Sequence, residues 1–354
     1  MSGHSSQTNP LDDKRLAAAG IKLPFVSVVV TCYNYENYIV ACLQSVARQS
    51  YPHFECVVVD DHSTDDSVRL IEEFIGSVKS AVKFFLVRHS SNGGQMAAFK
   101  TGLQHAQGVF VVFVDADDLL LEDFLVSHVR AHISARLPVA FTSSNQFQIN
   151  EDDQMTAGNH ADLQTNGKFR YVAPKSLQEP YWIWATTSSM MFRRAILQAI
   201  LPDDCEPFRV CADNYICHFA NLVGGSMLIP TVHGCYRRHG RNCFSNNPIV
   251  GGCLPTGDMR RHPRHKVVRT GIVSHLQKNR ERFVGMLSEP RFTSTILLAS
   301  TPLEIWQNRK YRPELFPGKG NLFFFSLSAY AVLLRMKLII AKMLRMAGEQ
   351  LFSV

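Results

Sequence analysis

The chain has 354 residues, more than one compact domain usually contains, which predicts either one large domain with an appendage or two domains. Hydrophobic residues make up 46% and charged residues 19%, so the composition excludes an intrinsically disordered chain and a fibrous repeat. The net charge of +7 is modest for this length and suits an anionic cofactor, an anionic membrane or a nucleic acid equally well.

Cysteine usage and the first residues bear on the cellular compartment. Nine cysteines are present, an odd number without Cys-x-x-Cys spacing, so the sequence predicts neither a disulfide framework nor a zinc ribbon. Residues 1–10 are polar and lack the apolar core of a secretory signal. We therefore expect a cytoplasmic protein in which residues 1–23 form a flexible N-terminal segment.

From residue 24 onward, short β-branched runs alternate with segments of helical periodicity. Strands are predicted over residues 26–31, 56–60, 82–87 and 109–114, with a helix after each of them. Repeated βα units imply parallel strands with right-handed crossovers and a ligand crevice at the carboxyl ends of the strands.

The rhythm weakens after a predicted helix at residues 122–135. The polar stretch of residues 145–168 is predicted as a loop or an irregular hairpin outside the sheet. Order resumes at residues 182–194, where a strand of small polar residues leads into a helix at Ala195. A further helix is predicted over residues 213–222 and a strand over residues 226–232.

The tail of the chain has a different composition. A basic run at residues 260–266 precedes an apolar stretch at residues 322–334, which is too short for a bilayer span of about 20 apolar residues. Basic residues among large apolar ones are typical of a helix on an anionic membrane surface, and equally of a helix that packs on protein. One expectation is therefore peripheral contact with the inner face of the plasma membrane through residues 322–346.

Two acidic turns follow predicted strands. Asp60 and Asp61 follow the second strand, where they are placed to accept hydrogen bonds from a base or a ribose. Asp115 and Asp117 follow the fourth strand. Because alternate strand positions point to one side, both of these carboxylates can reach one hard cation, which prefers oxygen ligands. Capping of the helices that follow is the alternative interpretation.

Five segments in a fixed order resemble the family 2 glycosyltransferases. The segments are residues 24–34 (PFVSVVVTCYN), 57–67 (VVVDDHSTDDS), 92–102 (NGGQMAAFKTG), 113–118 (FVDADD) and 211–213 (CAD). The resemblance implies an α/β fold of the GT-A type, a Rossmann-like mixed sheet flanked by helices, with a mainly helical C-terminal extension. It covers residues 24–245, divided into a nucleotide-binding half (24–135) and an acceptor-binding half (136–245), and leaves residues 246–354 as a basic, amphipathic extension.

Members of this family transfer a sugar from a nucleotide diphosphate to an acceptor hydroxyl with inversion. The resemblance implies a UDP- or dTDP-sugar donor, a glycan or lipid-linked glycan acceptor as in polysaccharide biosynthesis, and no nucleic-acid partner. It implies that Asp213 is the general base and that Asp115 and Asp117 hold Mg²⁺ or Mn²⁺. The residues implied to bind the nucleotide are Thr31, Tyr33, Asp60, Asp61, Lys100 and Asp115.

Two further pairs are candidates for substrate contact. Arg238 and His239 resemble a late family motif that reaches the diphosphate or the metal, with a solvated basic strand end as the alternative. Trp182 and Trp184 are candidates for an acceptor platform, with core packing as the alternative. The chain departs from the family pattern at His62, where Gly is usual and a larger residue constrains the turn.

Two other functions remain open on the sequence alone. Sugar-phosphate nucleotidyl transfer uses a related sheet and a cation, but residues 31–34 lack its usual glycine-rich, basic signature. The second alternative is a non-catalytic adaptor that binds a nucleotide sugar and docks on a membrane through its tail.

Overall fold

The computed structural model describes residues 20, 22–79, 82–178, 181–240, 242, 263–301, 329, 332, 333 and 336. The chain divides into unit 1, Met1–Lys175 with Tyr181–His262, and unit 2, Ser176–Pro180 with Pro263–Val354. Most of residues 1–23, and all but a few of residues 322–346 with their expected membrane contact, lie outside the described residues. None of the described helices is long and apolar enough to cross a membrane.

Four parallel strands form the first half of the sheet in unit 1, as the βα periodicity predicts. They are β1 (Val26–Cys32), β2 (Phe54–Asp60), β3 (Lys83–Arg88) and β4 (Phe110–Asp115). Their order is β3-β2-β1-β4, with Val29 level with both Val57 and Phe113. Because β1, β2 and β4 are buried almost throughout, they require the unbroken apolar runs seen in the sequence.

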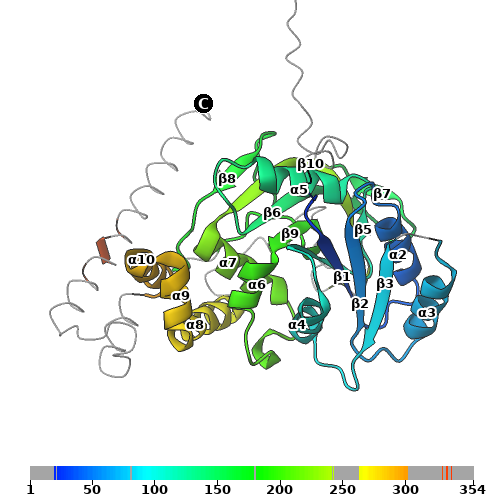
Figure 1. The fold of residues 1–354 in the computed structure, drawn as a ribbon, viewed down its shortest axis with the longest axis horizontal. Helices are drawn as coiled ribbons and strands as arrows, with labels where there is room; N and C mark the ends of the chain where they lie inside the picture. Colours follow the sequence, from blue (N-terminus) through cyan, green and yellow to red (C-terminus); the bar gives the residue numbers. More distant parts are fainter. Residues whose placement is uncertain are drawn as a thin grey trace, which may run out of the picture. The chain divides into compact units, whose positions relative to one another are not determined.

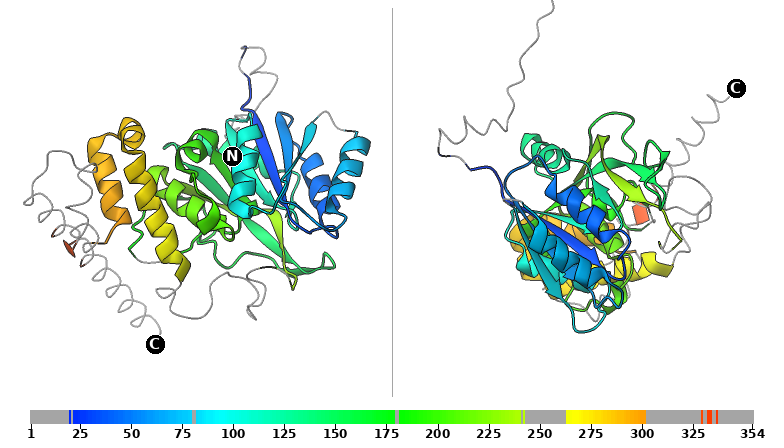
Figure 2. Two further views of the ribbon diagram at one scale, coloured as in Figure 1. Left: turned by 90° about the horizontal axis from the view of Figure 1, so that it is seen from below. Right: turned by 90° about the vertical axis from the view of Figure 1, so that its right-hand side faces the viewer.

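Helices cover both faces of these strands (Figures 1 and 2). One face packs against α2 (Ile39–Ala47), α3 (Ser67–Ser77) and α5 (Phe124–Ser134), and the other against α4 (Gln95–His105). On the α4 side, Phe99 stacks on Phe113 with ring centroids 4.1 Å apart, and Gly102 meets Val29 so closely that a Cβ would not fit. This packing fixes the carboxyl ends of β1, β2 and β4 at one edge.

The second half of the sheet mixes strand directions. β9 (Met190–Arg193) lies antiparallel between β4 and β6 (Phe141–Ile149), and β10 (Ser226–Arg237) runs parallel to β6. The short strands β5 (Leu119–Leu120), β7 (Met155–Ala157) and β8 (Arg170–Val172) pair with β10, β6 and β10. The connections include α6 (Arg194–Ile200), α7 (Ala212–Gly224) and the 3₁₀ helices η1 (Thr187–Ser189) and η2 (Glu206–Phe208). Over the described residues these strands form one mixed sheet, which confirms the predicted fold class.

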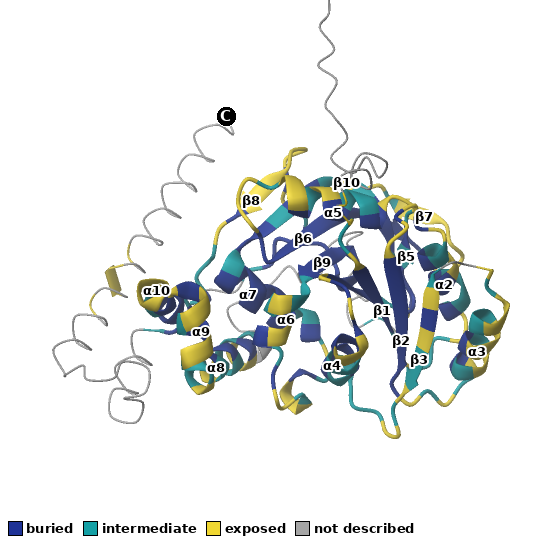
Figure 3. Ribbon diagram, in the orientation of Figure 1, coloured by how far each residue is buried: buried dark blue, intermediate teal, exposed yellow. Residues whose placement is uncertain are grey.

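The position of residues 145–149 corrects the prediction for the polar stretch. These residues continue β6 inside the sheet, and only the chain beyond Ile149 forms the irregular hairpin, through β7. β6 has the sequence FTSSNQFQI and is buried at nearly every position (Figure 3), although most of its side chains are polar. Its side chains are hydrogen-bonded to distant segments, so hydrophobic periodicity gives no sign of the strand. β10 likewise continues past the predicted end at residue 232.

Unit 2 is helical in its described part. It contains α8 (Pro263–Lys278), α9 (Arg280–Leu287) and α10 (Glu289–Ala299). Ile272, Phe283 and Phe292 are fully buried, and Arg280 forms a 2.6 Å ion pair with Glu289. This confirms the predicted helical character of the C-terminal part.

Candidate functional site

The carboxyl ends of β1, β2 and β4 bring several predicted site residues to one edge of the sheet (Figure 1). Thr31 lies level with Asp115, and the N–H of Ala116 donates to the carbonyl of Thr31 at 3.2 Å. Asp60 ends β2, and Tyr33 follows β1 with 44% of its surface exposed. The register of parallel strands therefore gathers the candidates for nucleotide binding at the same edge as the acidic residues after β4.

Asp61 anchors the loop that precedes α4. Its carboxylate accepts hydrogen bonds from the N–H groups of Gly93 and Gly94 at 2.8 and 2.7 Å, and lies 2.7 Å from Nδ1 of His89. Gly94 has a φ of +82° and sits against the backbone of Arg209, so no other residue fits there without strain. Asp61 thus has a structural contact in this loop, while its predicted contact with a nucleoside stays a prediction.

Asp60 and the turn after it lie beside this loop. Asp60 is buried, and its Oδ2 accepts the N–H of Ser63 at 3.1 Å. Its Oδ1 has no hydrogen-bond partner among the described residues. His62 adopts a φ of +68°, the left-handed conformation that glycine tolerates best, which explains why a larger residue constrains this turn.

Asp115, Asp117 and Asp118 form the acidic turn, which we define as residues 115–118. The N–H of Asp115 donates to Oγ of Ser188 at 3.0 Å, so that η1 supports the turn. Desolvation is the main cause that raises the pKa of Asp115 to about 7, and repulsion by Asp117 and Asp213 adds to it. Desolvation, together with repulsion by Asp117 and Asp115, also raises the pKa of Asp118 well above its usual value.

His239 lies directly beside Asp117. Its Nε2 is 2.9 Å from Oδ2 of Asp117, and Nδ2 of Asn242 donates to the same oxygen at 3.1 Å. The imidazole stacks on Tyr38 with centroids 5.0 Å apart and meets Tyr35 edge-on at 6.0 Å. The chain after β10 therefore brings an imidazole to the acidic turn, while the implied contact of His239 with the diphosphate or the metal stays a prediction.

Asp213 lies in the first turn of α7, close enough to Asp115 to affect its pKa. Gln95, the first residue of α4, connects the two elements. Its Nε2 donates to Oδ1 of Asp115 at 3.2 Å, and its Oε1 accepts the N–H of Ala212 at 2.9 Å. Gln95 was missed by the sequence analysis, in which its only signal is its place within the NGGQMAAFKTG segment.

Lys100 is a half-buried residue of α4. Its Nζ donates to the carbonyls of Pro202 and Asp203 at 3.2 and 3.0 Å. The ammonium group thus holds the loop after α6 in this structure. Its implied contact with the nucleotide stays a prediction.

Trp182 and Trp184 are both buried, and Trp184 is 0% exposed. Nε1 of Trp182 donates to the carbonyl of Ala185 at 3.2 Å, and Nε1 of Trp184 donates to Oγ of Ser226 at 3.0 Å. These are the contacts of core packing, the alternative that the sequence left open. A platform for an acceptor at this place stays a prediction.

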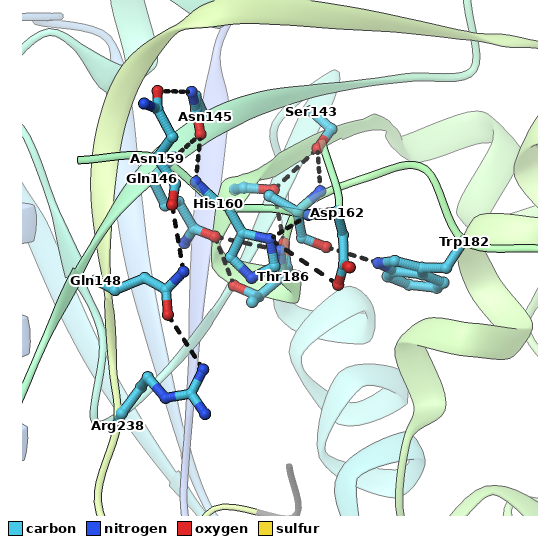
Figure 4. A network of polar contacts seen from close by, with 12 residues as sticks. Ser143, Asn145, Gln146, Gln148, Asn159, His160, Asp162, Trp182, Thr186 and Arg238 are labelled. Atoms are coloured by element: carbon cyan, nitrogen blue, oxygen red, sulfur yellow. Dashed lines mark hydrogen bonds and ion pairs between the residues drawn. The ribbon is translucent and has the colours of Figure 1, made fainter. Parts of the chain in front are cut away.

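Arg238 lies at one end of a buried polar network (Figure 4). Its guanidinium donates to Oε1 of Gln148 at 3.1 Å, and Nε2 of Gln148 donates to the carbonyl of Asn159 at 3.2 Å. Further along β6, Oε1 of Gln146 accepts both the N–H and the hydroxyl of Thr186. The network joins β6 to the loop around Asn159 and to the segment before η1.

The acidic turn fits a divalent cation by its chemistry. After desolvation, repulsion by the charges of Asp117 and Asp213 contributes to the raised pKa of Asp115, and a bound cation would relieve this repulsion. Among the residues that the structure describes, no group of three or more His, Cys, Asp or Glu side chains is arranged as a metal site. Mg²⁺ is commonly bound through one or two carboxylates, with substrate phosphates and water as its other ligands. The pair of Asp115 and Asp117 matches that donor set.

The comparison with protein families decides the classification. Residues 27–201 match the model of the family described as "Glycosyl transferase family 2". This segment, about half of the chain, is a glycosyltransferase family 2 sequence. This match includes β1, β2 and β4, whose carboxyl ends carry the acidic residues and which we call the acidic edge. It confirms the resemblance seen in the sequence motifs.

Two bacterial proteins are examples of the relatives of this chain. It is 28% identical to an uncharacterized glycosyltransferase of Nostoc sp. over 223 residues, which cover 61% of this chain and 66% of the relative. It is 38% identical over 101 residues to the poly(ribitol-phosphate) beta-N-acetylglucosaminyltransferase TarS of Staphylococcus aureus, covering 28% of this chain and 17% of TarS. The aligned segments therefore span less than two thirds of the length of these relatives.

A solved structure shares the fold. The crystal structure of S. aureus TarS 1-349 superposes with a TM-score of 0.50 at 18% sequence identity, covering 83% of this chain and 75% of that structure. At this identity the likeness shows the fold alone, and it agrees with the GT-A sheet described above.

Proposed function

We propose that this chain transfers a sugar from a UDP- or dTDP-sugar to a hydroxyl of a glycan or lipid-linked glycan, with inversion at the anomeric carbon. The observation that carries the proposal is the meeting of three groups at one edge of the sheet. Asp60 ends β2 and Asp61 follows it, the acidic turn begins at the end of β4, and Asp213 lies in the first turn of α7, close enough to Asp115 to affect its pKa. The name of TarS, a transferase for poly(ribitol-phosphate), supports a polymeric acceptor.

In this proposal residues 24–135 bind the nucleotide and residues 136–245 bind the acceptor, with residues 246–354 as an extension. Thr31, Tyr33 and Asp60, which lie at the ends of β1 and β2, would contact the nucleoside. Oδ1 of Asp60 has no hydrogen-bond partner within the described part of the chain, which supports this role, because a buried acceptor without a hydrogen bond is costly unless a ligand donates to it.

Asp115 and Asp117 would hold Mg²⁺ or Mn²⁺, which when bound supplies Lewis-acid stabilisation of the charge on the leaving diphosphate. The contribution of the chain is to hold these carboxylates in place. Gln95 donates to Asp115, while His239 and Asn242 fix Asp117. Both carboxylates are thereby oriented before any ligand arrives.

Asp213 would act on the acceptor. Its carboxylate takes the proton of the acceptor hydroxyl while that oxygen bonds to the anomeric carbon. The bond from the same carbon to the diphosphate oxygen breaks on the opposite face, which inverts the configuration. General base catalysis of this kind contributes about a hundredfold to ten-thousandfold in rate.

The test is transfer by the purified chain with Mn²⁺, a panel of nucleotide sugars and glycan acceptors, measured as release of nucleoside diphosphate and as product. Asp213→Asn is expected to lower kcat by about a hundredfold to ten-thousandfold with little change in the donor KM. Asp117→Ala is expected to lower kcat/KM and to raise the Mn²⁺ concentration needed for half-maximal activity.

Glu73→Gln serves as the matched control, because this carboxylate lies on α3 with 60% of its side chain exposed. It is expected to keep wild-type activity. Unchanged turnover in both Asp213→Asn and Asp117→Ala would contradict the proposal. Release of pyrophosphate from a nucleoside triphosphate and a sugar phosphate would instead identify a nucleotidyltransferase, and saturable donor binding without turnover would identify a binding protein.

A further inference from the structure

Arg237, the last residue of β10, has a buried guanidinium to which none of the roles above is assigned. Its side chain is 1% exposed. Nε donates to the carbonyl of Asp117 at 2.8 Å, NH1 donates to the carbonyl of Asn150 at 3.0 Å, and NH2 pairs with Oδ1 of Asp153 at 2.6 Å. One side chain therefore joins the acidic turn to the turn of the β6–β7 hairpin.

The backbone of Arg237 reaches the same turn. Its N–H donates to Oδ1 of Asp118 at 2.9 Å. Its carbonyl accepts Nδ2 of Asn242 at 3.0 Å, and the same nitrogen donates to Oδ2 of Asp117 at 3.1 Å. Both the side chain and the backbone of Arg237 thus fix the position of Asp117.

Tyr38 connects Arg237 to His239. The guanidinium lies over the Tyr38 ring, 4.8 Å from its centroid, and the imidazole of His239 stacks on that ring at 5.0 Å. A planar guanidinium that binds in two directions and also stacks on an aromatic ring has little freedom to move. A shift of Arg237 would therefore be passed to His239 as well as to Asp117.

Asp153 is the exposed end of this connection, with 64% of its side chain accessible. Its φ of +62° is left-handed, a conformation that costs a non-glycine residue energy. The turn is held by Oδ1 of Asn150, which accepts the N–H groups of Asp152 and Gln154 at 3.1 and 2.9 Å. A charge as deeply buried as that of Arg237 needs an opposite charge nearby, and Asp153 supplies it from the surface.

We propose that Arg237 and Asp153 are positioning residues for the transfer reaction, which set the place of Asp117 and His239 from the hairpin turn without touching substrate. The catalytic consequence rests on the proposed function, whereas the mechanical link is measurable without turnover. Removal of Asp153 leaves the buried guanidinium without one of its acceptors, so that it relaxes and releases the carbonyl of Asp117. Loss of a residue that hydrogen-bonds to a metal-binding side chain typically lowers metal affinity or activity by about 10-fold to 100-fold.

The first experiment compares Asp153→Ala with Asp152→Ala. Both side chains are exposed in the same turn, but of the two it is Asp153 that binds Arg237 in the described structure. Asp153→Ala is expected to raise the Mn²⁺ concentration for half-maximal activity by about 10-fold or more, and Asp153→Asn, which keeps an acceptor oxygen, to restore part of the loss. Asp152→Ala is expected to behave as wild type. A merely structural role would lower the melting temperature of Asp153→Ala and leave its Mn²⁺ dependence unchanged.

The second experiment needs neither metal nor donor. Hydrogen exchange of the free protein is expected to be faster in Asp153→Ala than in wild type for peptides that contain residues 115–121 and residue 237, and unchanged in Asp152→Ala. If exchange is faster in Asp153→Ala but the wild-type chain transfers no sugar, the connection from Asp153 through Arg237 to Asp117 is supported and only the proposed function is overturned. Equal exchange and equal Mn²⁺ dependence in the two variants would overturn the positioning role.

Discussion

The two halves of the sheet in unit 1 bury their strands by different means. β1, β2 and β4 fill the interior with valine and phenylalanine, whereas β6 buries serine, threonine, asparagine and glutamine (Figure 3). Apolar burial is non-directional and depends on area, while buried polar groups must meet their partners in a definite geometry. The first half therefore supplies a rigid edge for the acidic residues, and the second half orients the side chains that face that edge.

The largest effect is expected from a cavity in the apolar half. Phe113→Ala removes a fully buried ring that stacks on Phe99 at 4.1 Å. It is expected to lower the free energy of unfolding by about 3–5 kcal/mol, measured by urea denaturation. Phe113→Leu fills more of the space and is expected to cost less. An equal loss in the two variants would show that packing volume does not govern this half.

A hydrogen-bond defect in the polar half is expected to cost less. Gln146→Leu keeps the volume but leaves the N–H and hydroxyl of Thr186 without their acceptor. It is expected to lower the free energy of unfolding by about 1–3 kcal/mol, with some offset because Nε2 of Gln146 has no partner among the described residues. Gln104→Leu on the exposed face of α4 is the control and is expected to stay within about 0.5 kcal/mol of wild type. If Gln146→Leu raises the free energy of unfolding, the buried hydrogen bonds of β6 do not stabilise the second half of the sheet, and the contrast with the apolar half fails.

His132 tests the boundary between the two halves. Its ring stacks on Phe110 of β4 at 4.5 Å, and its Nε2 lies 3.0 Å from the carbonyl of Met191 in β9. Burial lowers the pKa of His132 to about 3, so below about pH 6.5 the unfolded chain binds a proton that the folded chain does not. Folding stability from this group is therefore present above pH 6.5 and is lost as the pH falls toward 3.

Asp115 and Asp118 have raised pKa values, so they change the free energy of unfolding with pH in the opposite direction to His132. This contribution is the same in wild type and in His132→Gln. The difference in the free energy of unfolding between the two proteins therefore isolates His132. The destabilisation by His132→Gln is expected to shrink by about 1.4 kcal/mol between pH 7.5 and pH 5.5, most of it below pH 6.5, in urea denaturation at pH 7.5, 6.5 and 5.5. A difference that does not vary with pH would mean that folding leaves the pKa of His132 unchanged, and would contradict this expectation.

The smallest effect is expected at His62 in the turn after β2. Its φ of +68° is strained for a residue with a Cβ. His62→Gly is expected to raise the free energy of unfolding by up to about 1 kcal/mol, since relief of strain is partly cancelled by the greater freedom of glycine in the unfolded chain. Thermal unfolding checks the sign, and a loss of stability would show that the imidazole makes a contact that outweighs the strain.

The apolar half of the fold could be predicted from the sequence because its strands carry their own signal. Val57 to Val59 and Val111 to Val114 are buried on both faces, and a continuous apolar run reports this directly. Asn145 and Gln146 give the opposite signal, since they are typical of loops unless their partners are known. Those partners, Asn159 and Thr186, lie 14 and 40 residues away. A pattern of local periodicity cannot report contacts of that range.

The candidate site shows the same division. Asp115, Asp117, Asp213 and His239 stood out as acids or metal-binding side chains in motifs, and the structure brings them to one edge. Gln95 and Arg237 did not, because each acts through a contact distant in sequence. Gln95 reaches the N–H of Ala212 across 117 positions, and Arg237 reaches Asp153 across 84. Residues that only position others carry no chemical signature of their own.

The division of roles at the acidic edge is the central claim, and a thermal-shift comparison with Mn²⁺ and a panel of nucleotide sugars tests it most directly. A ligand that binds the folded state raises its stability by about 2.7 kcal/mol at one hundred times its dissociation constant. We expect a rise in melting temperature that requires both Mn²⁺ and a nucleotide sugar, persists in Asp213→Asn and disappears in Asp117→Ala. A full rise in Asp117→Ala, or none in the wild-type chain with any nucleotide sugar, would contradict the account.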